Sequence, residues 1–167
     1  MKNFIKGLFL SAVLSMSMVA CDDEVGLPDN GTPSNPEKAV VGVYEGTWKT
    51  TDTKDEVVEY PGTLTFTDIN ERYVVDVIAD CPALFRGPLL LDTDELQSVA
   101  NISHTSAGYS YHNTLETNGF GSQFWGVVSE DKVATILFKK TIKEGRKQNT
   151  YTITFEGALK GQPATEE

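Results

Sequence analysis

The feature that most constrains the fold of this chain is a strict alternation of bulky apolar residues with threonine. Residues 151–155 (YTITF) show it most clearly, and residues 63–67 (TLTFT) repeat it. Successive side chains of a β-strand point to opposite faces, so a period of two gives one apolar and one polar face. No long amphipathic helical pattern interrupts these segments. The chain is therefore predicted to be all-β.

Further segments rich in β-forming residues bring the prediction to about eight strands. They are expected at 40–50, 63–67, 73–78, 97–103, 108–115, 123–129, 132–138 and 151–155. Turn signals are expected to separate them at Pro61-Gly62, 68–70, 118–119, 129–131 and 144–145. One helical turn is expected at 37–39 after Pro36, and a short helix is expected to open at 92–96.

Hairpin spacing between these segments predicts an antiparallel meander. A sheet of this size exposes two unpaired edge strands unless it closes on itself. Closure into a barrel removes the edges, and we take it as the predicted architecture. A β-sandwich is the alternative.

Composition limits the classes of function. The chain has 167 residues with eight Phe, six Tyr and two Trp, enough for the core of one domain. Its net charge of −10 argues against a nucleic-acid partner, because phosphates need Lys and Arg. Two Cys and two His are too few for a metal cluster or a disulfide scaffold, so neither metal nor cofactor is expected. We find no catalytic motif and predict that the protein is not an enzyme.

The N-terminus carries an export signal. Lys2 and Lys6 precede an apolar stretch, 8–19, that is too short to cross a bilayer comfortably. Residues 18–21 (MVAC) resemble a bacterial lipobox, in which a small residue precedes a cysteine that becomes the lipidated N-terminus. The resemblance implies a signal peptide over 1–20 and lipid attachment at Cys21.

Residues 22–24 (DDE) follow this cysteine directly. They resemble the export tag that sends lipoproteins of the Bacteroides group to the outer face of the outer membrane. An outer-membrane lipoprotein exposed at the cell surface is therefore expected, with a periplasm-facing position as the alternative. Residues 21–36 are expected to be an acidic, proline-rich tether, 37–161 the folded domain, and 162–167 a polar tail.

The mature chain is more acidic than its precursor. After residues 1–20 are removed, 12 Lys and Arg face 24 Asp and Glu, a net charge of −12. Such a surface avoids anionic lipid head groups, so the membrane is expected to be a partner only through the acyl chains.

The start of the predicted domain carries a further resemblance. Gly46-Thr47-Trp48 is similar to the Gly-x-Trp that opens the first strand of lipocalins and fatty-acid-binding proteins. The resemblance implies a lipocalin-like (calycin-like) barrel in which Trp48 plugs one end and Gly46 allows a neighbouring strand to approach. The Arg-x-Tyr near the end of fatty-acid-binding proteins is absent, so a carboxylate clamp is not implied.

Aromatic residues supply the candidate binding site. Rings on several predicted strands would fill a narrow barrel or line an apolar cavity in a wider one. The interior candidates are Tyr44, Trp48, Phe66, Tyr109, Tyr111 and Trp125. Cys81 is expected to be a buried, unpaired thiol, and residues 82–91 (PALFRGPLLL) to cover a barrel end or to form an apolar docking patch.

These observations favour a non-enzymatic binding barrel on a membrane anchor. Its ligand is expected to be a small apolar molecule or an extracellular protein or glycan partner. The alternative is a structural or inhibitory protein that docks onto another protein through the barrel loops.

Overall fold

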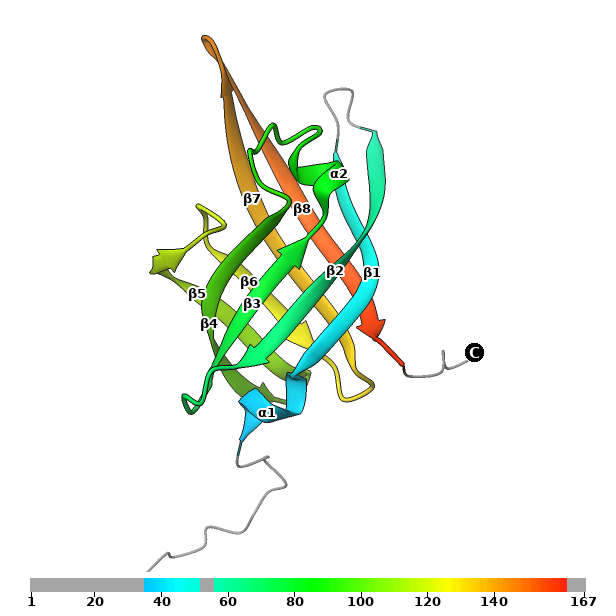
Figure 1. Ribbon diagram of the computed structural model, residues 1–167, viewed down its shortest axis with the longest axis vertical. Coiled ribbons are helices and arrows are strands. Elements are labelled where there is room, and N and C mark those ends of the chain that lie inside the picture. Colours follow the sequence, from blue (N-terminus) through cyan, green and yellow to red (C-terminus); the bar gives the residue numbers. More distant parts are fainter. Residues whose placement is uncertain (1–34, 52–55, 162–167) are drawn as a thin grey trace, which may run out of the picture. The chain divides into compact units, whose positions relative to one another are not determined.

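The computed structural model describes residues 35–51 and 56–161, except for the side chains of 114–118 and 144. These residues belong to one unit, Thr32–Glu167. Eight antiparallel strands follow one another in a meander that closes into a barrel (Figure 1). The strands are β1 (Gly42–Thr51), β2 (Val57–Asp68), β3 (Val74–Asp80), β4 (Glu95–Thr105), β5 (Gly108–Asn118), β6 (Phe124–Val128), β7 (Val133–Glu144) and β8 (Lys147–Leu159).

The predicted all-β barrel is confirmed, and the alternative of a β-sandwich is wrong. Closure occurs where β1 pairs with β8, with Trp48 opposite Phe155. Gly46 lies opposite Gly157 at this seam, and a Cβ atom at Gly46 would overlap the backbone of Glu156 and Gly157. Glycine is therefore required where the first and last strands meet.

One turn prediction is wrong. Pro61 and Gly62 lie inside β2, opposite Thr47 and Gly46 of β1. The pairing of β2 with β3 begins only at Thr63, so Pro61 has a strand on one side alone. A proline is tolerated in a strand where no neighbour needs its missing N–H group.

The short helix expected at 92–96 is also absent. Thr93 Oγ1 instead donates to the carbonyl oxygen of Glu95, which begins β4. The helix in this region is α2 (Pro82–Phe85), inside the apolar segment. Proline at the first helical position explains its start, because proline lacks the N–H group that a helix leaves unpaired there.

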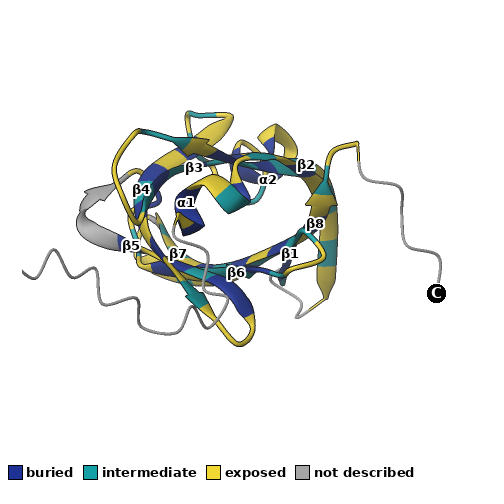
Figure 2. Ribbon diagram, turned by 90° about the horizontal axis from the view of Figure 1, so that it is seen from below, coloured by how far each residue is buried: buried dark blue, intermediate teal, exposed yellow. Residues whose placement is uncertain are grey.

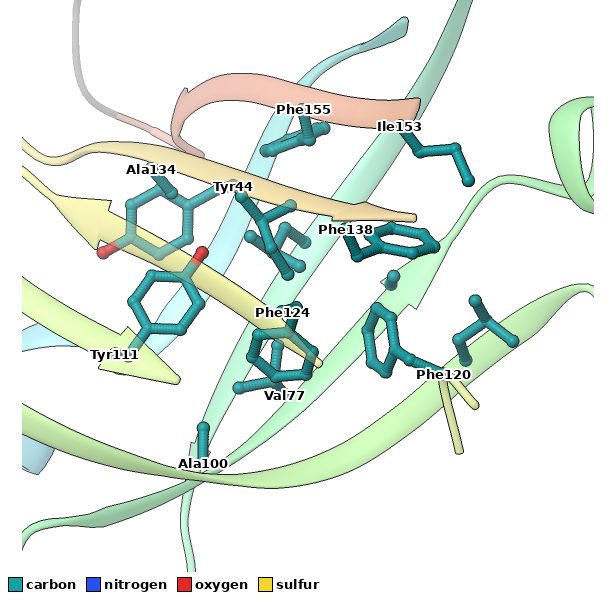
Figure 3. Close-up of a cluster of buried hydrophobic side chains, with 14 of the residues drawn as sticks. Tyr44, Val77, Ala100, Tyr111, Phe120, Phe124, Ala134, Phe138, Ile153 and Phe155 are labelled. Atoms are coloured by element: carbon teal, nitrogen blue, oxygen red, sulfur yellow. The ribbon is translucent and has the colours of Figure 1, made fainter. Parts of the chain in front are cut away.

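Aromatic rings fill the barrel from one end to the other. Tyr111 contacts Phe124 with 6.1 Å between ring centroids, and Phe124 contacts Phe120 at 4.6 Å. Phe120 contacts Phe138 at 5.1 Å, and Phe138 contacts Trp48 at 6.3 Å. Figure 3 shows Tyr111, Phe124, Phe120 and Phe138 following one another across the interior. These edge-on and tilted contacts are favourable for rings, and they occupy the space in which a ligand would lie.

A helical segment covers each end of the barrel. The turn expected after Pro36 is α1 (Pro36–Val40), which lies across one opening (Figure 2). At the other end the segment after Cys81 buries Leu84, Phe85 and Leu89. Residues 82–91 therefore cover a barrel end, although Leu90 remains 59% exposed. Neither helix of the described part of the chain is long and apolar enough to span a bilayer.

Candidate functional site

Five of the six interior candidates lie in the core. They are Tyr44, Trp48, Phe66, Tyr109 and Tyr111. Trp125 does not join them: its side chain is 52% exposed on the outer wall, and the expectation of an interior position is wrong. Its neighbour Phe124 faces inward, and adjacent strand residues point to opposite faces.

The buried tyrosine hydroxyls bind the protein's own backbone. Tyr44 donates to the carbonyl oxygen of Val40 at 3.0 Å, and Tyr111 donates to that of Thr135 at 2.7 Å. Burial raises the pKa of Tyr44 to about 12 and raises the pKa of Tyr111 well above its usual value. Both hydroxyls are thus neutral and already bonded, and neither is free to orient a ligand.

The outer wall carries a groove of about 770 Å³. Its outward-facing residues follow two rows of cross-strand neighbours over β5, β6, β7, β8 and β1, on either side of the row Tyr111, Gly126, Ile136 and Phe155. One row consists of His112, Trp125, Leu137, Thr154 and Lys49. The other consists of Ser110, Val127, Thr135 and Glu156.

The floor of the groove depends on a glycine. The side chain of Tyr111 lies under Gly126, where a Cβ atom would overlap both the tyrosine ring and the carbonyl oxygen of Thr135. This gap in β6 lets the Tyr111 hydroxyl reach Thr135 on β7. The Thr135 hydroxyl bonds back to the carbonyl oxygen of Val127 at 3.2 Å. The residues beneath the groove are therefore held by packing and by two hydrogen bonds.

Charged and polar groups lie along the groove that the exposed indole of Trp125 lines. Lys49 forms a 2.9 Å ion pair with Glu59, which raises the pKa of Lys49, and Glu156 adds a smaller effect of the same sign. His112 is exposed directly opposite Trp125. The groove thus offers one aromatic surface together with amine, imidazole, carboxylate and hydroxyl groups, a combination suited to a polar ligand with flat apolar faces.

The other reactive side chains that the structure describes lie apart from one another. His104 pairs with Glu130 at 2.7 Å and lies against Tyr109, away from His112 in the groove. Asp94 pairs with Arg86. Cys81 is buried as expected, and burial raises the pKa of its thiol. Within residues 35–51 and 56–161, no group of three His, Cys, Asp or Glu side chains is placed to hold a metal.

The expected lipid-attachment residue, Cys21, and the acidic tripeptide after it fall outside the described residues.

The sequence does not predict the groove itself. One sequence signal nevertheless points to it: if Phe124 faces the core, its neighbour Trp125 must face solvent.

Comparison with protein-family models and with curated proteins gives no match for this chain. The fold and the groove therefore carry the functional argument.

Proposed function

We propose that this chain is a lipid-anchored, non-enzymatic binding protein whose ligand occupies the outer groove at Trp125. The exposed indole carries the proposal. A half-exposed tryptophan costs solvation free energy on a folded surface, and Trp125 lines a groove of ligand size together with polar residues. The barrel, in this proposal, is a rigid frame that holds strand residues in place.

The packing of the interior argues against a ligand there. Trp48 lies between Phe155, at 4.8 Å between ring centroids, and Phe85 of α2, at 5.9 Å. Insertion of an apolar molecule would have to separate these rings and displace a covered end. An outer site needs no such change, since strand residues are already exposed.

The anchor is proposed from the sequence. The lipobox at 18–21 and the acidic residues at 22–24 support a lipoprotein of the Bacteroides type, with a lipocalin-like barrel, on the outer face of the outer membrane. Metabolic labelling with palmitate tests the anchor. Labelling of the native chain and its loss in Cys21→Ser are expected, and unchanged labelling of the variant contradicts lipidation.

Protease treatment of intact cells tests the location. Cleavage of the native protein is expected if the barrel faces the medium. Protection in intact cells with cleavage after outer-membrane permeabilisation would place it in the periplasm.

Fluorescence titration tests the binding site. The chain contains two tryptophans, and Trp48 is buried, so a ligand in the groove should mainly affect Trp125. The probes are palmitate, for the interior, and a panel of neutral and acidic oligosaccharides and peptides, for the groove. Saturable binding of a panel member to the native protein supports the proposal if calorimetry, which does not depend on the Trp125 signal, shows that Trp125→Ala has lost it. Saturable palmitate binding that Trp125→Ala leaves intact would contradict it, because it places the ligand inside.

A further inference from the structure

The long β7–β8 hairpin carries a positive charge that the rest of this acidic chain lacks. Of the 14 Lys and Arg residues of the chain, five lie within 139–147, whereas the net charge of the whole chain is −10. The hairpin rises beyond the other strand ends, at the end of the barrel away from α1 (Figure 1). Such a local concentration of one sign on a surface of the other raises the local concentration of anions.

This positive surface is continuous with the groove. Lys139 and Lys143 follow Leu137 on the outer face of β7, because residues two apart along a strand share a face. Between them Thr141 bonds to Thr150 of β8 through their hydroxyls, at 3.0 Å. At about 3.3 Å per residue, the six steps along β7 from Leu137 to Lys143 span about 20 Å. We call the outer face formed by Trp125, Leu137, Thr154, Lys139, Thr152, Thr141, Thr150 and Lys143 the hairpin strip.

The lysines of the strip are not used by the fold. Lys139 and Lys143 are exposed, and they form no ion pair with any side chain that the structure describes. Lys140, on the opposite face, behaves differently: its ammonium donates to the carbonyl oxygen of Phe120 at 2.9 Å, and burial lowers its pKa. One lysine of this segment therefore has a structural role, while the two on the strip remain available to an anion.

We infer that the ligand of the groove is an acidic polysaccharide, a chain of uronic acid residues that lies along the hairpin strip. This inference rests on the proposed function and names its ligand class. The indole of Trp125 packs against the apolar face of one sugar ring. Threonine hydroxyls bond to sugar hydroxyls, and the ammonium groups of Lys139 and Lys143 pair with the carboxylates of later sugar units.

Two other polymers fit the strip less well. An extended peptide binds best by adding a strand to a free sheet edge. Residues 139–144 and 147–152 pair only with each other, so their free edges run along the sides of the hairpin and not across the outer face that carries Trp125 and the two lysines. Single-stranded nucleic acid needs stacking on successive aromatic rings, whereas the strip presents one indole followed by threonines. A saccharide instead needs hydroxyl partners and a single stacking surface.

Calorimetry with a matched pair of probes tests the inference. The probes are the hexamer of galacturonic acid and the same hexamer with every carboxylate methyl-esterified, titrated into the full mature chain. The acidic hexamer is expected to bind more tightly than the esterified one, and its binding is expected to weaken when salt is added. The double variant Lys139→Gln/Lys143→Gln is expected to lower the affinity for the acidic hexamer about tenfold, at the upper end of the range for two exposed charge contacts. Its affinity for the esterified hexamer is expected to stay unchanged.

A matched control separates a local effect from net charge. Lys38→Gln/Lys160→Gln removes the same charge from exposed positions outside the strip, and affinity within about twofold of the native value is expected, as for any weak long-range effect. Near-ultraviolet circular dichroism verifies that each variant is folded. Equal loss in both double variants would contradict the strip, since net charge alone would then explain the affinity.

The remaining outcomes distinguish the inference from the proposed function. Equal binding of acid and ester that depends on Trp125 overturns the acidic ligand and leaves a neutral-saccharide groove. Equal binding of the acid and of hexathymidylate overturns a saccharide site and indicates a general polyanion surface. If neither hexamer binds while another panel member requires Trp125, only the inference fails. If nothing binds in a Trp125-dependent way, both fail.

Discussion

Gly126 is the residue that most directly shapes the outer groove. Its missing side chain leaves room for the Tyr111 ring beneath β6, and its own strand position lies between Trp125 and Val127. An ordinary side chain here would have to push β6 outward. The shape of the groove thus depends on the absence of one carbon atom.

Gly126→Ala is therefore expected to destabilise the protein by about 2–3 kcal/mol, because the new methyl group overlaps Tyr111 and the carbonyl oxygen of Thr135. Urea unfolding measures the change. Tyr111→Phe is the milder comparison: it removes only the 2.7 Å hydrogen bond, at a cost of about 1 kcal/mol. If Gly126→Ala unfolds at the same urea concentration as the native protein, the floor of the groove is not tightly packed.

The buried tyrosines predict a pH dependence. Tyrosine in an unfolded chain ionises near pH 10, whereas burial raises the pKa of Tyr44 to about 12. Because the folded-state pKa is the higher one, the neutral phenol stabilises the fold at every pH below 10. That contribution, about 2–3 kcal/mol for Tyr44, is lost as the pH rises from about 10 to about 12.

Urea unfolding at pH 9 and pH 11 tests this dependence, and phenolate absorbance follows ionisation of the native chain. Tyr44→Phe should lose less stability between these two pH values than the native protein, although burial also raises the pKa of Tyr111 in the variant. An identical loss in both proteins would mean that Tyr44 ionises as easily when folded.

At the scale of elements, hydrogen bonds to the barrel hold α1 in place, because the helix is too short to be stable alone. Glu37 accepts from the backbone N–H group of Tyr73 at 3.1 Å, and Lys132 donates to the carbonyl oxygen of Ala39 at 2.8 Å. Tyr44 bonds to its last residue, Val40. A helix of five residues is not stable alone, so these contacts with three strand ends hold it over the barrel.

Glu37→Ala should lower the free energy of unfolding by about 1–3 kcal/mol, because it leaves the Tyr73 N–H group without its acceptor. Glu37→Gln retains an acceptor oxygen of the same reach and should cost much less. Hydrogen exchange at Tyr73 measures the local effect. Equal protection of this amide in native protein and Glu37→Ala would contradict the attachment.

Like α1, the β5–β6 connection is held against the core by side-chain hydrogen bonds. Asn113 forms two bonds where the connection enters β6, donating to the carbonyl oxygen of Ser122 at 3.1 Å and accepting from the N–H group of Phe124 at 2.7 Å. Lys140 donates to the carbonyl oxygen of Phe120. These bonds hold the Phe120 ring inside the barrel.

Asn113→Ala is expected to cost about 2–3 kcal/mol, because a buried and a partly buried hydrogen bond are lost together. Asn113→Asp keeps the acceptor for Phe124 and loses only the donor, so it should restore part of the stability. Thermal unfolding of the three proteins compares them. If aspartate and alanine are equally destabilising, the bond to Phe124 contributes nothing.

At the scale of the whole molecule, closure makes the first and last strands neighbours. The pairing of β1 with β8 joins residues more than one hundred positions apart, and Trp48 packs on Phe155 across it. Loss of either strand would open two edges and expose the core at once. We therefore expect all eight strands to unfold together.

Urea unfolding of Trp125→Phe tests this cooperativity, because Trp48 is then the sole tryptophan and reports the seam. The transition in its fluorescence should coincide with the transition in far-ultraviolet circular dichroism, which reports all strands. Phe155→Ala should move both midpoints together, by a loss of about 3–5 kcal/mol. Separated transitions would show that the seam opens before the barrel unfolds.

Much of the fold could be predicted from local pattern. Strands were expected in the right order because alternation and β-branched content are properties of neighbouring residues. Pro61-Gly62 misled the turn prediction, since the same two residues suit a turn or a strand with one free side. The helix expected at 92–96 is absent for another reason: Asp94 pairs with Arg86, eight residues earlier, and β4 already begins at Glu95.

By itself the sequence determined that the chain forms alternating strands and which side chains of a strand share a face. Only the tertiary structure decided that the core is filled, and that Trp125 lines a groove with Lys49, Leu137 and Thr154. The physical reason is range. Burial on one face repeats every two residues, whereas the groove joins five strands whose register is set by hydrogen bonding around the closed barrel.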